Sequence, residues 1–241
     1  MAERDVEFKV FRYKQGEAAA HYDSFMVKTD ENTTALVALQ GIRRDDAPTL
    51  TLRHSCHHGS CGTCGMRVNG EEQLACVVNV QELETPTVVV EPLQNAPLVS
   101  DLVVDMAPFF DRYTQPEMPY VRRSDFNPDT AVPQGIKHYT RYENCLECGL
   151  CVSACPVMGS DASYLGPAAM AAAWRVVEEP RGSDAEFALN WVDNEHGCWR
   201  CHAAYECTAV CPSDVFPAEA IMSLRGELTK RKFRRVFGLG K

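Results

Sequence analysis

Several features are missing from this sequence, and each absence argues against a class of protein. No stretch approaches the roughly 18 apolar residues that cross a membrane. Residues 1–30 carry charges throughout, so we expect no secretory signal. Positive charge is in deficit, with 24 Lys and Arg against 33 Asp and Glu, and nucleic acid is not expected as a partner. Apolar residues, at 45%, are plentiful enough to exclude a disordered chain.

Cysteine, in contrast, is abundant, with 12 in 241 residues. Such a fraction is typical of small disulfide scaffolds or of proteins that bind several metal centres. A chain of this length can bury an ordinary core without disulfides, which favours metal centres. The cysteines form three groups: Cys56, Cys61, Cys64 and Cys76; Cys145, Cys148, Cys151 and Cys155; Cys198, Cys201, Cys207 and Cys211.

The first hundred residues have the pattern of a small α+β domain. Apolar and β-branched runs predict strands at 6–13, 24–29, 66–68, 73–77 and 87–90. Asn32 to Thr34 are suited to cap a helix that begins directly after them. Asn69-Gly70 favours a tight hairpin turn between two of the strands. We place this first domain at residues 1–105.

The second half of the chain has a helical pattern. Six prolines within residues 94–135 predict a connector, placed at 106–135, with one short helix at 99–112. Pro167 and Pro217 each stand at the start of a run of helix-forming residues. We therefore expect an all-α domain at 136–241, with cysteine-rich loops between its helices.

Charge is unevenly distributed, because residues 225–241 hold 7 Lys and Arg against 1 Glu although the whole chain is acidic. One interpretation is a helix end that is simply solvated. The other is a surface that contacts anionic lipid head groups or an acidic partner.

The first cysteine group has the Cys-x4-Cys-x2-Cys spacing of plant-type two-iron, two-sulfur sites, followed by a distant fourth cysteine. Gly59, Gly62 and Gly65 give its loop the freedom to fold tightly around a cluster, which backbone N–H groups can stabilise. Structural zinc favours paired Cys-x2-Cys knuckles and fits poorly. A single ligand from the adjacent histidines is a further alternative: His54, His57 and His58.

The second group, ending in Cys155-Pro156, is the bacterial ferredoxin run, whose fourth cysteine binds the other of two clusters. The third group ends in the same Cys-x3-Cys-Pro pattern, but residue 204, which would complete the run, is Ala. The spacing predicts a four-iron cubane on Cys145, Cys148, Cys151 and Cys211. It predicts a three-iron cluster on the three thiolates left over: Cys155, Cys201 and Cys207.

Cys198 lies outside the positions that the motif uses. It is either a free thiol or a fourth ligand that restores a second cubane. Zinc ribbons compete for the Cys-x2-Cys pairs, but the two Cys-Pro endings favour iron–sulfur clusters.

With all three groups in this order, the sequence resembles the iron–sulfur subunit of succinate dehydrogenase and quinol:fumarate reductase, the complex II family, over essentially its whole length. Gly166-Pro167-Ala168 and Arg200-Cys201-His202 also carry the resemblance. It implies an α+β fold, in which a plant-type [2Fe-2S] ferredoxin-like (β-grasp) domain precedes a bacterial ferredoxin-like double-cluster domain with [4Fe-4S] and [3Fe-4S] clusters. It implies electron relay between the FAD of a flavoprotein subunit and a membrane quinone, with no substrate chemistry on this chain.

The resemblance further implies that the two-iron cluster lies nearest the flavin and the three-iron cluster nearest the quinone. Pro156 and His202 are expected to approach the quinone, with Trp199 in its vicinity. The simpler interpretations are that His202 only bonds near cluster sulfur and that Trp199 only packs. Residues 157–161 lack the tryptophan of the ubiquinone-reducing branch, which favours menaquinone. A membrane-anchor subunit and a peripheral place on the cytoplasmic face of a bacterial membrane are implied too.

Two other functions remain compatible with the motifs. One is a soluble carrier made by fusion of two ferredoxins, which would be monomeric. The other is a subunit of a related thiol-linked fumarate or heterodisulfide-type reductase, a group that usually contains adjacent cysteines, of which this sequence has none.

Overall fold

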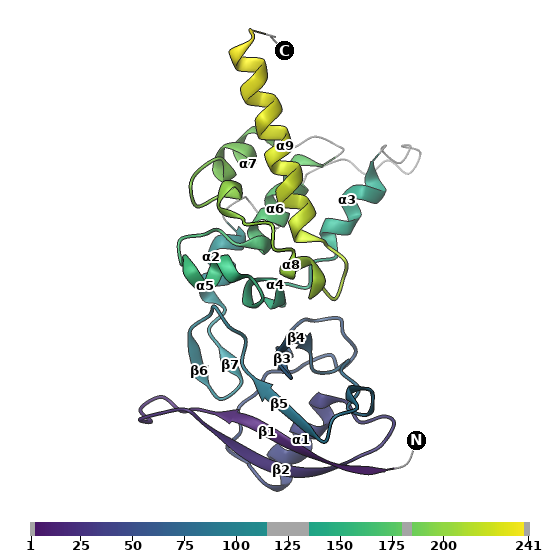
Figure 1. Cartoon of the computed structure of the whole chain (residues 1–241). Helices are drawn as coiled ribbons and strands as arrows, with labels where there is room; N and C mark the ends of the chain where they lie inside the picture. The colour runs from purple at the N-terminus through teal and green to yellow at the C-terminus, as the bar shows by residue number, and fades with distance from the viewer. Residues whose placement is uncertain (1–2, 115–134, 180–184, 239–241) are drawn as a thin grey trace, which may run out of the picture. The chain divides into compact units, whose positions relative to one another are not determined.

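The computed structural model describes residues 3–114, 135–179 and 185–238. These fall into two compact units (Figure 1). Unit 1 comprises residues 1–107 and 146–154, and unit 2 comprises residues 108–145 and 155–241. Most of the predicted connector, 106–135, lies outside the described residues.

Unit 1 is built on a mixed sheet of order β2-β1-β5-β3-β4. Its strands are β1 (Arg4–Arg12), β2 (His21–Thr29), β3 (Gly65–Val68), β4 (Glu71–Leu74) and β5 (Thr87–Glu91). β1 pairs antiparallel with β2 and parallel with β5, and β3 pairs antiparallel with β4 and β5. Val6, Phe8 and Val10 of β1 are fully buried, as their alternation predicts.

Helix α1 (Ala35–Asp45) and the short helix η1 (Gln81–Leu83) complete the main part of unit 1. The Thr34 side chain accepts a hydrogen bond from the Val37 N–H, so the predicted cap is confirmed. Asn69 and Gly70 have φ angles of 51° and 86°, the left-handed pair that a tight type I′ turn requires. The predicted strands are found, although β4 ends at Leu74 and leaves Cys76 in the turn that follows.

The helix predicted at 99–112 is wrong in its first half. Residues there form a hairpin of β6 (Leu98–Ser100) and β7 (Val103–Val104), and α2 (Ala107–Thr114) begins only afterwards. The cause is Asp101, which sits in the turn at φ 44° and is fully buried. Its carboxylate accepts the N–H groups of Tyr13 and Thr51 and bonds to Arg12 Nε, contacts that no local pattern reveals.

Residues 146–154 carry α4 (Leu150–Ser153) and pack within unit 1. The Ser153 hydroxyl donates to Glu72 Oε1 at 2.9 Å and accepts the Gln94 N–H at 2.8 Å. The Asn95 amide donates to the carbonyls of Val152 and Ser153, both at 2.9 Å. Leu150 is 1% exposed. This short segment is therefore held by both apolar burial and specific polar contacts.

The described part of unit 2 is helical, as its sequence predicts. Its helices are α3 (Ile136–Glu143), α5 (Pro156–Ser160), α6 (Pro167–Val177), α7 (Ala185–Val192), η2 (Cys198–Arg200), α8 (Glu206–Ala209) and α9 (Pro217–Val236). α6 is buried on nearly every side and contacts α3, α7 and α9, so it is the central helix of the unit. Pro167 and Pro217 both stand in the first turn of their helices, as expected.

Across the part of the chain that the structure describes, no helix combines the length and the apolar character that crossing a bilayer requires.

Candidate metal centres

The first cysteine group lies in the loop between α1 and β3 and in the turn after β4. Cys64 and Cys76 are buried, and Cys56 and Cys61 are half-buried. Backbone N–H groups point at the sulfurs: Ser60 and Cys61 each donate to Cys56 Sγ at 3.3 Å, and Gly59 donates to Cys76 Sγ at 3.2 Å. This is the environment that stabilises thiolate and cluster charge.

The cysteines of this loop have different pKa values because their surroundings differ. Hydrogen bonds from the backbone N–H groups of His58 and Ser60 lower the pKa of Cys56 to about 6. Burial raises the pKa of Cys64 to about 12, with further contributions from the neighbouring Cys76 and Cys61 thiols. The four sulfurs are thus close enough to influence one another, and binding at Cys64 requires that its proton be displaced.

Glycine is required at two places in the loop. Gly59 and Gly62 have φ angles of 72° and 70°, and a Cβ at Gly62 would lie 2.7 Å from the Leu146 carbonyl oxygen and 2.8 Å from Cys148 Cβ. The loop that carries Cys61 and Cys64 therefore packs directly against Cys148 inside unit 1. The first cysteine group therefore lies next to Cys148, which belongs to the second group.

The three histidines beside this loop have other partners. His54 Nδ1 lies 3.1 Å from His57 Nε2, and His58 Nδ1 lies 2.6 Å from the Cys56 carbonyl oxygen. These contacts give no support to a histidine ligand. The donor set that fits a two-iron cluster is the four thiols with their surrounding amides.

The second predicted set is distributed over both units. Cys148 and Cys151 belong to unit 1, and Cys145 and Cys211 to unit 2. All four are half-buried. Cys211 Sγ accepts the Val215 N–H at 3.4 Å, and Gly149 has a φ of 81°, which lets the chain turn between Cys148 and α4. The assignment of a cubane to these four cysteines remains a prediction from their spacing.

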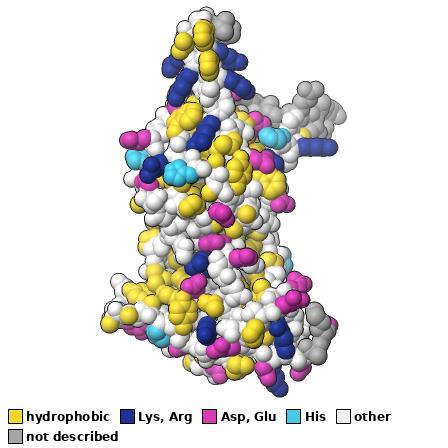
Figure 2. Space-filling view, viewed as in Figure 1, with side chains coloured by type: hydrophobic (Ala, Val, Ile, Leu, Met, Phe, Trp, Pro, Cys, Tyr) yellow, Lys and Arg dark blue, Asp and Glu magenta, His cyan; other side chains and the backbone are white. Residues whose placement is uncertain are grey.

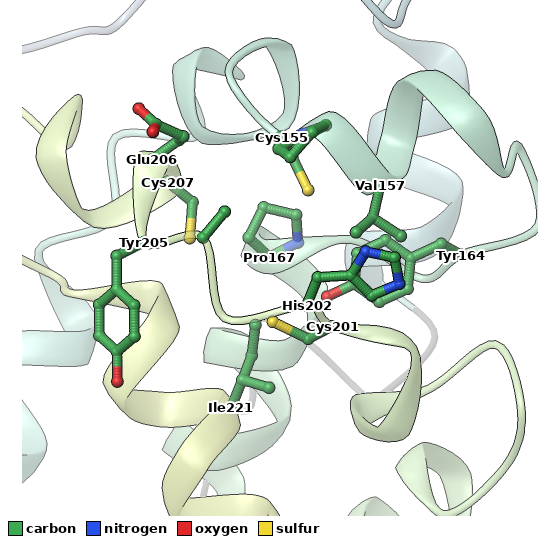
Figure 3. A pocket seen from close by; sticks show the side chains of 12 residues that line it. Cys155, Val157, Tyr164, Pro167, Cys201, His202, Tyr205, Glu206, Cys207 and Ile221 are labelled. Atoms are coloured by element: carbon green, nitrogen blue, oxygen red, sulfur yellow. The ribbon is translucent and has the colours of Figure 1, made fainter.

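The third predicted set converges on one cavity in unit 2. Cys155, Cys201 and Cys207 line a small cavity that is partly open to solvent, together with Tyr164 and His202 (Figure 3). Cys155 precedes α5, Cys201 follows η2 and Cys207 lies in α8. Ala204, where a fourth ligand would stand, faces the same cavity. Burial raises the pKa of Cys207 to about 12, and the neighbouring Cys155 and Cys201 thiols add to this shift.

Tyr164 is a residue of this cavity that sequence reasoning missed. Its side chain is fully buried. Burial raises the pKa of its hydroxyl well above the ordinary range, and the nearby Cys201, Cys155 and Cys207 thiols contribute further. Tyr164 lines the same cavity as Cys201. A neutral hydroxyl is thus held against the predicted ligands, and only its place two residues before Gly166-Pro167 could have drawn attention to it.

Of the three residues expected near a quinone, two lie at the cavity. Pro156 and His202 line it, and His202 is exposed. Trp199 is not among the lining residues. Its ring lies under Lys232 Nζ, 4.7 Å from the ring centroid, and its N–H donates to Asp193 at 2.5 Å. Trp199 is 40% exposed, so its ring is held by Lys232 and Asp193 at the surface, and its expected place near a quinone stays a prediction.

Cys198 is separated from the cavity. It is fully buried and does not line the space that Cys155, Cys201 and Cys207 share. Burial raises its pKa to about 11, and the charged groups that act on it are Arg225, Asp193 and Lys232. Arg225 donates to the carbonyl oxygens of Cys198, Trp199 and Cys201 at 2.9, 3.2 and 2.5 Å. The arrangement favours a buried free thiol in a turn that Arg225 holds in place.

In the described ranges, no group of three or more Cys, His, Asp or Glu side chains is arranged so that it could hold a single metal ion. The donor sets consist instead of thiols, with backbone amides directed at several of the sulfurs. This chemistry suits iron–sulfur clusters, in which sulfur ligands hold a core larger than one ion.

Comparisons with known proteins agree with the two kinds of site. Residues 7–111 match the family described as 2Fe-2S iron-sulfur cluster binding domain, and residues 141–215 match the 4Fe-4S dicluster domain. The fumarate reductase iron-sulfur subunit of Escherichia coli O6:H1 is 34% identical over 236 residues, covering 95% of this chain and 96% of that protein. The succinate dehydrogenase iron-sulfur subunit of Paracoccus denitrificans is 33% identical, covering 87% of this chain and 82% of its own.

A solved structure supports the fold. A chain of the Mycobacterium smegmatis Sdh1 complex in the apo form matches with a TM-score of 0.85 at 21% identity, covering 96% of this chain and 98% of that one. The predicted pair of ferredoxin-like domains is thereby confirmed.

Proposed function

We propose a path for electrons through this chain, which belongs to the family of iron–sulfur subunits of succinate dehydrogenase and fumarate reductase. As a member of that family it transfers electrons by means of [2Fe-2S], [4Fe-4S] and [3Fe-4S] clusters and performs no chemistry on succinate or fumarate itself. Each cluster, when bound, supplies a one-electron carrier. What the chain contributes is ligation, spacing and the environment of each site.

The ligands in this proposal are the cysteines predicted from spacing. The two-iron cluster is held by Cys56, Cys61, Cys64 and Cys76, and the four-iron cluster by Cys145, Cys148, Cys151 and Cys211. The three-iron cluster is held by Cys155, Cys201 and Cys207. The observation that supports this proposal is the cavity in unit 2, which is lined by Cys155, Cys201 and Cys207 together with Ala204.

The order of the clusters is supported by the packing of unit 1. Gly62 permits the loop with Cys61 and Cys64 to contact Cys148 at van der Waals distance, so the first two sites are neighbours. The three-iron site is bordered by His202, an exposed imidazole. We therefore place the flavin partner at the two-iron end and the quinone at the three-iron end.

The quinone is proposed to approach Pro156 and His202. An imidazole at this place is able to donate a hydrogen bond to a quinone oxygen or to relay a proton, which quinone reduction needs. Menaquinone is favoured, since residues 157–161 contain no tryptophan. The partners in this proposal are an FAD-containing subunit and a membrane-anchor subunit, with the chain peripheral on the cytoplasmic face of a bacterial membrane.

Ala204→Cys tests the assignment of the three-iron site. Because residue 204 lines the cavity of Cys155, Cys201 and Cys207, a thiolate there should supply the missing ligand and retain a fourth iron. We expect the three-iron EPR signal of the oxidised protein to disappear and a second cubane signal to appear on reduction. Iron per chain should rise by one atom.

Two variants control this experiment. Ala209→Cys adds a thiol on an exposed position of α8 outside the cavity, and Cys198→Ala removes the buried thiol. Both should keep the three-iron signal. Loss of the three-iron signal in Cys198→Ala would show that the ligand set is misassigned. So would its persistence in an Ala204→Cys protein whose introduced cysteine is unmodified.

His202→Gln tests the quinone site. Glutamine retains a hydrogen-bonding group but cannot exchange a proton near neutral pH, so quinone-linked turnover should fall by roughly 10²-fold. Succinate oxidation with a dye that takes electrons from the flavin should keep its rate. His138→Gln, a change at an exposed histidine paired with Glu178, should affect neither. Equal losses in both assays would argue that His202 acts on the structure or the cluster and not on the quinone.

A further inference from the structure

The C-terminal part of α9 is a helix without a covering partner among the described residues. Leu228 is the last buried residue among those that the structure describes, and none from Thr229 to Gly238 is buried. We call residues 229–238 the α9 tip. It extends beyond the other helices of unit 2 (Figure 1). Arg231 and Lys232 tie its first part to other residues of unit 2 through ion pairs with Glu186 and Asp193, and from Phe233 to Gly238 every residue is exposed.

One face of the α9 tip is apolar. Phe233, Val236 and Phe237 are 59%, 78% and 65% exposed. Their spacing of three and four residues places them on the same side of the helix. The two phenylalanine rings stack with centroids 5.9 Å apart and an interplanar angle of 5°. The stacked rings and the valine form a continuous apolar stripe that faces solvent.

Cations border this stripe on both sides. At 100° per residue, Lys230 and Arg234 lie on one flank, Lys232 lies on the other, and Arg231 and Arg235 lie opposite the stripe. Figure 2 shows the hydrophobic side chains at the tip with Lys and Arg around them. No acidic residue occurs between positions 228 and 238, although the whole chain has a net charge of −9.

These five cations are not all neutralised by the protein. Three of them pair with acids: Lys230 with Glu227, Arg231 with Glu186 and Lys232 with Asp193. Arg234 and Arg235 have no ion pair or hydrogen bond within the described residues. Of these two cations, Arg234 stands beside the apolar stripe and Arg235 lies on the opposite face, both at the outer end of the helix.

This combination matches the polar–apolar boundary of a bilayer better than it matches a protein groove. A helix that lies in the headgroup layer places an apolar face toward the acyl chains and leaves its flanking Lys and Arg among anionic head groups. A protein groove deep enough to cover Phe233 and Phe237 would also desolvate the cations on both flanks, which is costly unless each meets an acid.

We propose that the α9 tip binds the surface of a bilayer containing anionic lipid, with Phe233, Val236 and Phe237 inserted, Arg234 on lipid phosphates, and Arg235 attracted by the negative surface potential from the opposite face of the helix. The contact would attach the subunit to the membrane directly, in addition to any anchor protein. It is independent of cluster assignment and quinone chemistry, because no residue of the tip lies in a predicted cluster or quinone site.

The test is flotation of the full-length, cluster-loaded chain with protein-free vesicles. We expect partition onto vesicles of equal parts phosphatidylglycerol and phosphatidylcholine, and little onto phosphatidylcholine alone. Arg234→Gln with Arg235→Gln should lower the partition coefficient by roughly 30-fold. Phe233→Ser with Phe237→Ser should lower it by more than about 100-fold.

Matched variants elsewhere serve as controls. Arg43→Gln with Arg44→Gln removes two adjacent exposed arginines from α1, and Met26→Ser removes a side chain of β2 that is 67% exposed. Both should bind like the wild type, and all variants should keep its circular dichroism and cluster absorbance. The proposal is overturned by equal binding to both vesicle types, by binding that the tip variants leave unchanged, or by binding that appears only when a membrane protein is present.

Discussion

Replacing Cys64 with alanine should abolish electron transfer between succinate and quinone while succinate still reduces a dye at the flavin. Cys64 is 3% exposed and lies beside Cys61 and Cys76, so no water or other side chain can easily take its place as a ligand. Loss of a metal's outer-sphere partner already costs 10- to 100-fold. Loss of a ligand should therefore lower quinone-linked turnover by more than about 100-fold.

The measurement compares the two activities and the EPR spectrum of the same purified complex. The two-iron signal should be lost, whereas the signals of the other two clusters should remain. Cys198→Ala is the matched control, since it also removes a buried thiol but none of the predicted ligands. If Cys64→Ala retained rapid transfer from succinate to quinone, the proposed order of clusters would be wrong.

Gly197→Ala should destabilise unit 2 and remove the three-iron cluster. A Cβ at position 197 would overlap the backbone carbonyl of Val192. Relief of this overlap requires the backbone at Gly197 to move, and this would shift the turn that leads through η2 to Cys201. Overpacking of this kind costs about 3 kcal/mol. For a chain of this size, that should lower the melting temperature by about 6–12 °C. The three-iron EPR signal should weaken or vanish with it.

Gly226→Ala is the control for this effect. Position 226 is inside α9, and a Cβ there would meet no atom within 4 Å. Because alanine favours a helix over glycine, this variant should gain up to about 1 kcal/mol and keep all three EPR signals. A Gly197→Ala protein with wild-type melting temperature and a full three-iron signal would contradict the close approach seen in the structure.

Local patterns were sufficient for much of the fold. The strand β1 and the helix α1 follow directly from residue spacing, because each exposes one face and buries the other. The hairpin of β6 and β7 was mistaken for a helix because its turn depends on Asp101. That residue's partners, Arg12 and Thr51, are 89 and 50 positions away in the sequence. Long-range polar contacts of this kind leave no periodic signal.

The candidate sites likewise contain residues that the sequence predicts and residues that it does not. Cysteine spacing predicts thiol ligands because cluster geometry restricts how far apart along a loop they can lie, and the cavity does bring Cys155, Cys201 and Cys207 together. Tyr164 and Arg225 were not predicted. Both reach Cys201 or its turn from other parts of the chain, and a single tyrosine or arginine in a helical region carries no distinctive spacing.

The nine residues 146–154 affect how the two halves of such a protein can be exchanged during evolution. The chain leaves unit 2 after Cys145, supplies this segment to unit 1 and returns at Cys155. A gene fragment that encodes only the first hundred or so residues would lack the Ser153 partner of Glu72 and the carbonyl acceptors of Asn95. Exchange of the first ferredoxin-like half alone would therefore leave these polar groups of unit 1 without their partners. We therefore expect residues 146–154 to vary together with the residues of unit 1 that they contact.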